Sequence, residues 1–240
     1  MRPDTALVGC TGWSIPRLLA DRFPGPGSHL ERYARRFGAV EVTSSFYRPH
    51  RTQTYARWAA SVPGDFRFSV KLPRRITHES GLENIDDALA GFASEVAGLE
   101  GHLGCVLVQL PPKAAFDAAR ASTAFSRMRR VFKCMLACEA RHPSWFGDAA
   151  TALLQDHAIT RVIADPAKGQ AGAHVPTTAD IYVRLHGSPR VYYSSYPDAY
   201  LAALADDLRI HARAGRRVWL FFDNTASGAA MANALQLRYP

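Results

Sequence analysis

The sequence predicts an α/β fold, a single (β/α)8 barrel of the TIM type that forms one domain over residues 1–240. Eight strand-like runs recur along the chain, and each is followed by a connecting segment. No linker divides the chain, and 240 residues is close to the usual length of such a barrel. An open doubly wound sheet is the alternative, but no Gly-x-Gly-x-x-Gly motif follows the first strand to support it.

Apolar runs with a two-residue alternation mark the strands. Phe68 and Val70 are expected to face one side of their strand, and Ser69 and Lys71 the other. The eight strands are expected at residues 6–13, 39–49, 67–73, 104–110, 133–141, 160–165, 180–187 and 217–224.

Amphipathic patterns occupy most of the connections. Ser28 is expected to cap a helix that places Leu30, Tyr33 and Phe37 on one face. The link at residues 166–179 is too short and too rich in glycine and proline for a full helix, so the sixth helix is predicted to be degenerate. Helices are expected at residues 29–37, 52–62, 85–99, 117–132, 149–157, 200–214 and 228–238.

The net charge of +8 suggests nucleic acid as a partner. However, only four of the 29 basic residues are lysines, and the chain is rich in alanine. An excess of arginine and alanine can reflect genome composition alone. The position of the arginines therefore says more about function than their number.

The sequence gives no sign of a membrane or of an oxidising compartment. No run approaches the ~20 apolar residues of a membrane span. Residues 1–10 lack the charged-then-apolar layout of a signal peptide. The four cysteines lie in apolar runs without a Cys-x-x-Cys pair, as expected of buried, reduced thiols. A cytoplasmic protein without a membrane partner is therefore predicted, and protein partners are not indicated.

Polar side chains gather where the expected strands end. In a barrel these ends share one face, and alternate residues point inwards. Burying several charged groups without partners is costly, so their number favours a functional site over structural ion pairs. Glu41 is expected to be ionised beside Lys71 of the next strand. The inward set is Glu41, Thr43, Lys71, Gln109, Glu139, Arg141, Asp165, Arg184 and His186, with Asp223 or Asn224 from the last strand.

The loops at the same face carry cations and aromatic residues. Cations predict a positive mouth and an anionic ligand with a phosphate, a carboxylate or a nucleic-acid backbone. Residues 188–197 hold three tyrosines and an arginine and are expected to form a lid. The expected ligand contacts are Tyr47, Arg48, His78, Gln109, His142, Arg190, Tyr193, Asp223 and Asn224.

Short motifs follow one another along the chain: G-C-T-G-W-S (9–14), V-E-V-T-S-S-F-Y (40–47), F-S-V-K (68–71), T-H (77–78), Q-L-P-P (109–112), E-A-R-H-P-S-W-F (139–146), R-L-H-G (184–187) and F-D-N-T (222–225). In this order they resemble the family of domain of unknown function 72, also called YecE-like. The resemblance covers essentially the whole chain. It implies a TIM-type barrel distantly similar to the sugar-isomerase and endonuclease IV-like barrels, and it implies no settled activity.

Two departures from the family pattern stand out. The family usually has Asn-Asn where this chain has Asp223-Asn224, which adds a carboxylate to the site. An aromatic residue that usually follows the first Gly-Trp is also missing, since Ile15-Pro16 and Leu18-Leu19 occupy that loop.

Three kinds of chemistry can be weighed at the strand ends. A glycosidase needs two facing carboxyls ~5–10 Å apart, one with a raised pKa, but the cations beside Glu41 and Glu139 oppose such a rise. A divalent metal needs three or more converging His, Asp or Glu ligands, but nearby cations compete with it. The candidate metal ligands are Glu41, Glu139, Asp165, His78, His142 and His186.

We favour a site without a metal or other cofactor, in which Lys71, Arg141 and Arg184 hold an anionic group. Glu41, Glu139 or His186 then acts as general acid or base, or positions the substrate. A phosphorylated small molecule or a nucleic-acid end fits best, in a hydrolysis, isomerisation or lyase step. The alternatives are a metal-dependent endonuclease IV/isomerase-like enzyme and a non-catalytic barrel that binds nucleic acid with a basic rim of Arg48, Arg51, Arg74, Arg75 and Arg190.

Overall fold

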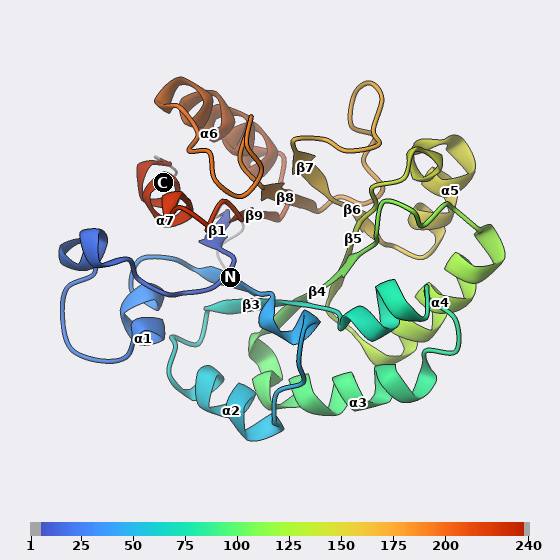
Figure 1. Cartoon of the computed structure of the whole chain (residues 1–240), viewed down its shortest axis with the longest axis horizontal. Coiled ribbons are helices and arrows are strands. Elements are labelled where there is room, and N and C mark those ends of the chain that lie inside the picture. The colour runs from blue at the N-terminus through green and yellow to red at the C-terminus, as the bar shows by residue number, and fades with distance from the viewer. Residues whose placement is uncertain (1–5, 238–240) are drawn as a thin grey trace.

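The computed structural model describes residues 6–237. Its strands surround a common centre, and most helices lie outside them (Figure 1). The strands are β1 (Leu7–Cys10), β2 (Ala39–Val42), β3 (Arg67–Lys71), β4 (Leu103–Gln109), β5 (Met135–Glu139), β6 (Thr160–Arg161), β7 (Ile163–Asp165), β8 (Ile181–Leu185) and β9 (Val218–Phe222).

All strand pairs within residues 6–237 are parallel, and they form two sheets. One sheet has the order β1–β9–β8–β7 and the other the order β2–β3–β4–β5–β6. The predicted α/β class with parallel sheets is confirmed. Because the strands of each sheet are parallel, their carboxyl ends lie on one side, where the connecting loops begin.

The facing edges of the two sheets, β1 and β2, are joined through Tyr33. Its hydroxyl accepts a hydrogen bond from the Cys10 N–H at 2.7 Å and donates one to the Ala39 carbonyl oxygen at 3.0 Å. Gly9 allows this approach, because a Cβ atom there would lie 2.0 Å from the Ala39 oxygen. A buried side chain thus replaces the missing strand ladder.

The sheets also meet at two other points. Thr11 and Glu41 form an isolated parallel bridge, and the Gly12 N–H donates to the Glu41 carbonyl oxygen at 3.0 Å. On the opposite side, Val162 interrupts the single strand that the sequence predicted and separates β6 from β7. The hydrogen-bonded ladders of residues 6–237 therefore do not close into one sheet, and the predicted single closed barrel is not confirmed.

The helices follow the predicted order with shorter ends. Ser28 caps α1 in a capping box with Glu31, as expected. Residues 166–180 contain no helix, which confirms the predicted degenerate connection. The predicted last helix extended to Arg238, which lies outside the described residues. The α-helices are α1 (His29–Ala34), α2 (Thr52–Ala60), α3 (Asp86–Val96), α4 (Ala118–Val131), α5 (Asp148–Asp156), α6 (Asp198–Arg213) and α7 (Ala229–Gln236).

Short helical turns occupy several segments that the sequence predicted as loops, and η2 replaces the end of the strand predicted at residues 39–49, because β2 ends at Val42. Three of them directly follow strand ends and so shape the candidate site. The short helical turns are η1 (Arg17–Arg22), η2 (Ser44–Phe46), η3 (Arg75–Glu79), η4 (Ala97–His102) and η5 (Pro143–Phe146). All of these are 3-10 helices except η3, which is a π-helix.

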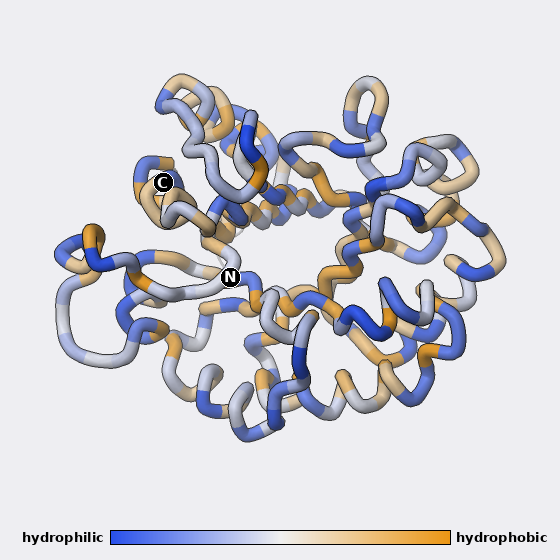
Figure 2. Tube along the Cα trace, viewed as in Figure 1, coloured by the Kyte–Doolittle hydropathy of each residue, from blue (hydrophilic) through white to orange (hydrophobic). Residues whose placement is uncertain are grey.

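Two hydrophobic cores lie on the two sides of the strands. The larger core packs the strands against the surrounding helices, and Figure 2 shows hydrophobic stretches along the strands with a mixed pattern on the outer helices. The smaller core draws side chains from both sheets: Leu7, Ala39, Cys105, Leu107, Met135, Ala137, Val162, Tyr182, Trp219 and Phe221.

The candidate site begins where this inner core ends. Ala39 and Ala137 belong to the inner core, and two residues further along the same strands come the buried Glu41 and Glu139. A two-residue step keeps a side chain on the same face of a strand. The inner face is thus apolar at the start of these strands and charged at their carboxyl ends.

Two expectations from composition can be compared with the structure. Within residues 6–237, no helix is both long and apolar enough to cross a bilayer. All four cysteines are free thiols, and Cys10, Cys105 and Cys138 are buried.

Candidate functional site

Arg184, near the end of β8, is the centre of a buried ion-pair network. Only 1% of its surface is exposed. Its Nη2 atom lies 2.6 Å from Glu41 Oε1 and 3.0 Å from Asp223 Oδ2, and its Nη1 atom donates to Glu139. Burial alone would lower the pKa of Arg184, but the three carboxylates hold that pKa well above its usual value. One guanidinium therefore joins acidic residues from three other strand ends.

His186 lies two residues further along and contacts two of the same carboxylates. Its Nδ1 atom is 2.9 Å from Asp223 Oδ2, and its Nε2 atom is 3.2 Å from Glu139 Oε1. Burial would lower the pKa of His186, but the hydrogen bonds to Asp223 and Glu139 outweigh it and raise that pKa. Thr11 donates to the other oxygen of Asp223 at 2.7 Å. This geometry favours an imidazolium ion held between two carboxylates.

Glu139 also binds the half-buried Arg141, which comes from the same strand end. Arg141 Nε and Nη2 lie 3.0 Å and 2.8 Å from Glu139 Oε1. Burial would raise the pKa of Glu139, but Arg184 and His186 outweigh it and hold that pKa well below its usual value. The side chain of Arg141 is 15% exposed, against 2% for Arg184. Arg141 is therefore the guanidinium of the network that solutes can reach.

Two residues below the charged layer were missed by the sequence analysis. Tyr182 donates to Glu41 Oε2 at 2.7 Å, and its hydroxyl lies 2.6 Å from the Ser69 hydroxyl. Both side chains are fully buried. The two-residue step along a strand could have identified both residues. Tyr182 lies two residues before Arg184 and Ser69 two residues before Lys71, so each pair shares one face of its strand.

The predicted pairing of Glu41 with Lys71 is wrong. Both oxygens of Glu41 are bonded to Arg184 and Tyr182. Lys71 instead donates to Gln109 Oε1 at 2.6 Å. The guanidinium of Arg184, which has several donors, reaches Glu41 from the other sheet and takes the place of the lysine as its partner.

Lys71 has no carboxylate partner among the ion pairs of residues 6–237. Its Nζ atom lies 4.0 Å from the centre of the Phe46 ring. Burial and the charge of Arg184 lower the pKa of Lys71 to about 8. The three carboxylates of the network are balanced by Arg184, Arg141 and His186, which leaves Lys71 as the surplus cation.

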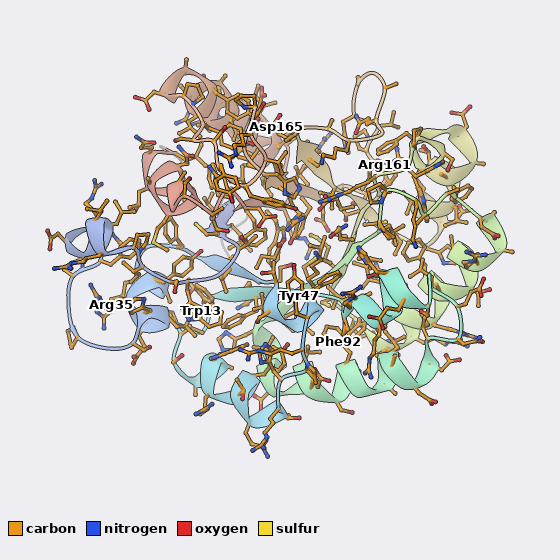
Figure 3. All side chains as sticks on the ribbon, in the orientation of Figure 1. Trp13, Arg35, Tyr47, Phe92, Arg161 and Asp165 are labelled. Atoms are coloured by element: carbon orange, nitrogen blue, oxygen red, sulfur yellow. The ribbon has the colours of Figure 1, made fainter. Side chains whose placement is uncertain are left out.

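Asp165 lies apart from this network, contrary to the expectation from strand alternation. Val162 packs in the inner core and Ile163 against the outer one, so Asp165 shares the outer face. There it raises the pKa of Tyr200, with burial as the larger cause. Figure 3 shows Asp165 and Arg161 towards the upper edge of the molecule, whereas Tyr47 lies near its centre.

The structure also resolves the ambiguity at the end of β9. Asp223 faces the network, whereas Asn224 turns away and donates to Ser194 and Asn233 at 2.9 Å each. Asn233, on α7, accepts from the Tyr196 N–H at 3.1 Å and donates to the Tyr196 carbonyl oxygen at 3.1 Å. A buried amide pair thus attaches the predicted lid to α7.

Replacing Asn233 with leucine should loosen this attachment. The Tyr196 backbone groups and the Asn224 amide would lose their partner in a buried position, at a cost of about 1–3 kcal/mol in unfolding free energy. Hydrogen exchange of residues 188–197 should accelerate more than that of β8. Exchange mass spectrometry measures this, with the exposed Gln155→Leu as the matched control; unchanged exchange in 188–197 would contradict the assignment.

The predicted lid, residues 188–197, packs against the His186 side of the network. The Tyr192 N–H donates to the His186 carbonyl oxygen at 2.5 Å, and the Tyr192 ring packs edge-on against the His186 ring at 5.9 Å. Arg190 lies over the Tyr193 ring at 4.0 Å. Residues 188–197 therefore cover His186 while their basic end stays exposed.

The remaining predicted ligand contacts surround the network without joining it. Tyr47 is 76% exposed, and Arg48 is also exposed. His78 packs edge-on against the Phe46 ring at 4.8 Å, and burial together with Lys71 lowers the pKa of His78 to about 4. His142 Nδ1 lies 2.8 Å from the Ser144 hydroxyl. Tyr47 and Arg48 are thus exposed, His78 and His142 are half-buried, and all four lie outside the buried network.

Two cavities open beside the strand ends. One of about 320 Å³ is lined by residues that include Thr11, Trp13, Thr43 and Thr225. The other, of about 270 Å³, lies between η3 and the start of α4 and is lined by residues that include His78. Thr11 links the first cavity to Asp223, and His78 links the second to the Lys71 side of the network.

The arrangement does not suit a divalent metal. Residues 6–237 contain no group of three or more His, Cys, Asp and Glu with metal-binding geometry. The oxygens that a metal would need, on Glu41, Glu139 and Asp223, already accept hydrogen bonds from Arg184, Arg141, His186, Tyr182 and Thr11.

Fold and site together define an α/β protein with parallel sheets and a buried charged network at the carboxyl ends of its strands. The chain matches the family model described as "Protein of unknown function DUF72" over residues 7–239. The chain therefore belongs to this family, as its motifs indicated.

Relatives with curated names carry no stated activity. UPF0759 protein YecE of Escherichia coli K12 is 28% identical over 164 residues, which is 66% of this chain and 58% of that protein. UPF0759 protein YunF of Bacillus subtilis is 27% identical over 147 residues, or 58% of this chain and 51% of that protein. The match thus spans little more than half the length of these relatives.

Solved structures of the same family share the fold. A DUF72 family protein of Thermotoga maritima has a TM-score of 0.79 and 25% identity, covering 98% of each chain. One from Enterococcus faecalis has a TM-score of 0.81 and 22% identity, covering 98% of this chain and 94% of that one. These matches extend the fold assignment to nearly the whole chain.

Proposed function

We propose that the protein is an enzyme that binds a small molecule bearing a phosphate or carboxylate group at the carboxyl ends of its strands. Lys71 and Arg141 bind the anionic group. Gln109 holds Lys71 in position, Glu139 holds Arg141, and Arg184 fixes Glu139 together with Glu41. The reaction is a hydrolysis, an isomerisation or a lyase step. The observation that carries the proposal is the surplus charge of Lys71 above an otherwise balanced network.

The role of Arg184 differs from the sequence-based assignment. Arg184 was expected to bind the anion, but its guanidinium is buried and already bonded to three carboxylates. Breaking such pairs for a ligand would leave buried charges without partners, which costs several kcal/mol. Arg141 is more exposed and binds a single carboxylate, with Tyr192 as a further partner, so it can offer a remaining donor to a ligand.

We further propose that the two sheets are halves of one (β/α)8 barrel that forms a single domain. The inner core collects side chains from both sheets, and Tyr33 ties their facing edges. Arg184 adds a third link, because it joins β8 of one sheet to Glu41 and Glu139 of the other. A barrel would place all the strand ends, and so the whole network, at one mouth.

Calorimetric titration with inorganic phosphate at low ionic strength tests the anion site. Lys71→Met and Arg141→Met should each weaken phosphate binding at least ~10-fold, which corresponds to ~1.4 kcal/mol. Affinity should also fall as the pH rises through about 8, because Lys71 loses its charge there. The exposed Lys133→Met removes the same charge elsewhere and should change little. Equal affinities in all variants would refute the proposal.

A basic rim favours nucleic acid as a second candidate ligand. Arg48, Arg51 and Arg190 are exposed, and none of them is among the ion pairs found within residues 6–237. Rim binding would weaken about 10³-fold or more between 50 and 200 mM salt if six phosphates were contacted. It would be insensitive to Lys71→Met, which separates the two candidates.

A further inference from the structure

We propose that Lys71 is an amine nucleophile that forms an imine with the carbonyl carbon of an anionic aldehyde or ketone. The inference rests on the proposed function, because Arg141 must hold the anionic group of the same molecule. It goes further by assigning a covalent step and by naming the substrate class, an anionic carbonyl compound.

The hydrogen-bond partner of Lys71 is suited to a reactive amine. Gln109 Oε1 accepts from Lys71 Nζ at 2.6 Å, while Gln109 Nε2 donates to the Leu110 carbonyl oxygen at 3.0 Å. The second bond fixes which end of the amide faces the lysine. A neutral oxygen accepts from an amine as well as from an ammonium, and it favours the charged form less than a carboxylate would. Gln109 therefore positions Nζ without holding its proton.

The surroundings of Lys71 also raise the share of its neutral form, although most Lys71 side chains stay charged at neutral pH. Burial and the nearby Arg184 charge lower the pKa of Lys71 to about 8. At pH 7.5 about a quarter of such side chains are neutral, against about one in a thousand for an ordinary lysine. Desolvation and a neighbouring cation are established ways to activate a lysine for attack on a carbonyl group. The other lysines, Lys113, Lys133 and Lys168, are exposed.

A proton carrier lies beside the same aromatic ring. Phe46 contacts Lys71 Nζ at 4.0 Å and the His78 ring at 4.8 Å. His78 is neutral at pH 7, because burial and Lys71 lower its pKa to about 4. Its Nδ1 atom lies 2.8 Å from the Thr77 hydroxyl, which orients the ring. His78 relays a proton from Nζ through an intervening water, because both groups lie against Phe46 and no direct hydrogen bond joins them within residues 6–237.

The chemistry balances without an oxidant, reductant or cofactor. Neutral Lys71 Nζ attacks the carbonyl carbon, a C–N bond forms, and the carbonyl π electrons move to oxygen. His78 carries one N–H proton to that oxygen, which gives a carbinolamine. It then carries the second N–H proton to the same oxygen as the C–O bond breaks. Water leaves, and a C=N bond joins Lys71 to the substrate carbon.

Pyridoxal 5′-phosphate and sodium borohydride test this step, since borohydride reduces an imine to a stable amine. The folded full-length protein is reacted and then digested for peptide mass spectrometry. The adduct should be found on Lys71, with at most one-tenth as much on any other lysine. Inorganic phosphate should suppress the adduct at Lys71. It should not suppress an adduct on the α-amino group, whose ordinary pKa is also near 8.

The outcomes separate this inference from the proposed function. If phosphate and pyridoxine 5′-phosphate, which lacks the carbonyl, bind at the site but Lys71 stays unmodified, the imine is overturned and the anion site stands. If neither ligand binds, both the imine and the proposed anion site are refuted. Gln109→Glu supplies a variant that keeps the lysine: the reaction midpoint should rise by at least one pH unit, and labelling at pH 7.5 should fall ~10-fold. An unchanged midpoint would overturn the inference.

Discussion

Arg184→Met should lower the unfolding free energy by about 3–5 kcal/mol at pH 7. Methionine fills most of the volume of the side chain but supplies no donors. Glu41, Glu139 and Asp223 would then remain close together at buried positions without the guanidinium that now joins them. Denaturant titration measures the loss.

The pH dependence identifies the cause of this loss. In the wild type, Arg184 helps to lower the pKa of Glu139 and of Asp223 against the opposing effect of burial. The stability that these carboxylates contribute is present above their ordinary pKa and is lost as the pH falls. In the variant burial dominates, so their pKa values rise and acid stabilises the folded state. The difference between the two proteins should therefore shrink from pH 7 to pH 5.

Arg217→Met is the matched control. Arg217 pairs with Asp180 at 2.5 Å, but its side chain is 56% exposed. Exposed pairs contribute about 0–1 kcal/mol. A comparable loss in both variants, or a loss in Arg184→Met that does not depend on pH, would contradict the account of a buried network.

Glu139→Gln should have opposite effects on stability and on anion binding. Glu139 accepts from Arg184, Arg141 and His186. A neutral amide loses these charge-assisted bonds, so unfolding free energy should fall by about 1–3 kcal/mol. The same change leaves two carboxylates against three network cations and releases Arg141. Phosphate affinity should therefore rise, by at least ~3-fold.

Histidine NMR and calorimetry measure the two sides of this prediction. The pKa of His186 should fall in the variant, because one of the two carboxylates that raise it is gone. Glu79→Gln makes the same chemical change in an exposed pair with Arg74, 3.0 Å apart, and should alter neither quantity. A parallel loss of stability and of phosphate affinity would argue against Arg141 as an anion-binding residue.

Periodicity was enough to predict the strands, most helices and the face on which the charges gather. It worked because the inner face follows a two-residue step, from Ala39 to Glu41 and from Ala137 to Glu139. It failed at Asp165, because Val162 and Ile163 are both apolar and either could face inwards. Only the packing of Val162 in the inner core decides that Asp165 faces outwards.

Partner choice within the network could not be read from the sequence. Adjacent strands suggested that Glu41 would pair with Lys71, but the long planar guanidinium of Arg184 reaches Glu41 from the other sheet. The pairing depends on side-chain reach and on the closeness of the two sheets, which Tyr33 and Gly9 set. Periodicity along a strand carries no information about either.

The central claim is that Lys71 and Arg141 bind an anion above a balanced network. A crystal of the wild-type protein soaked in phosphate tests it most directly. The account predicts a phosphate group within ~3.2 Å of Lys71 Nζ and of an Arg141 nitrogen, with the bonds of Arg184 to its carboxylates intact. Phosphate bound only at Arg48, Arg51 or Arg190, with Lys71 still bonded to Gln109 alone, would contradict it.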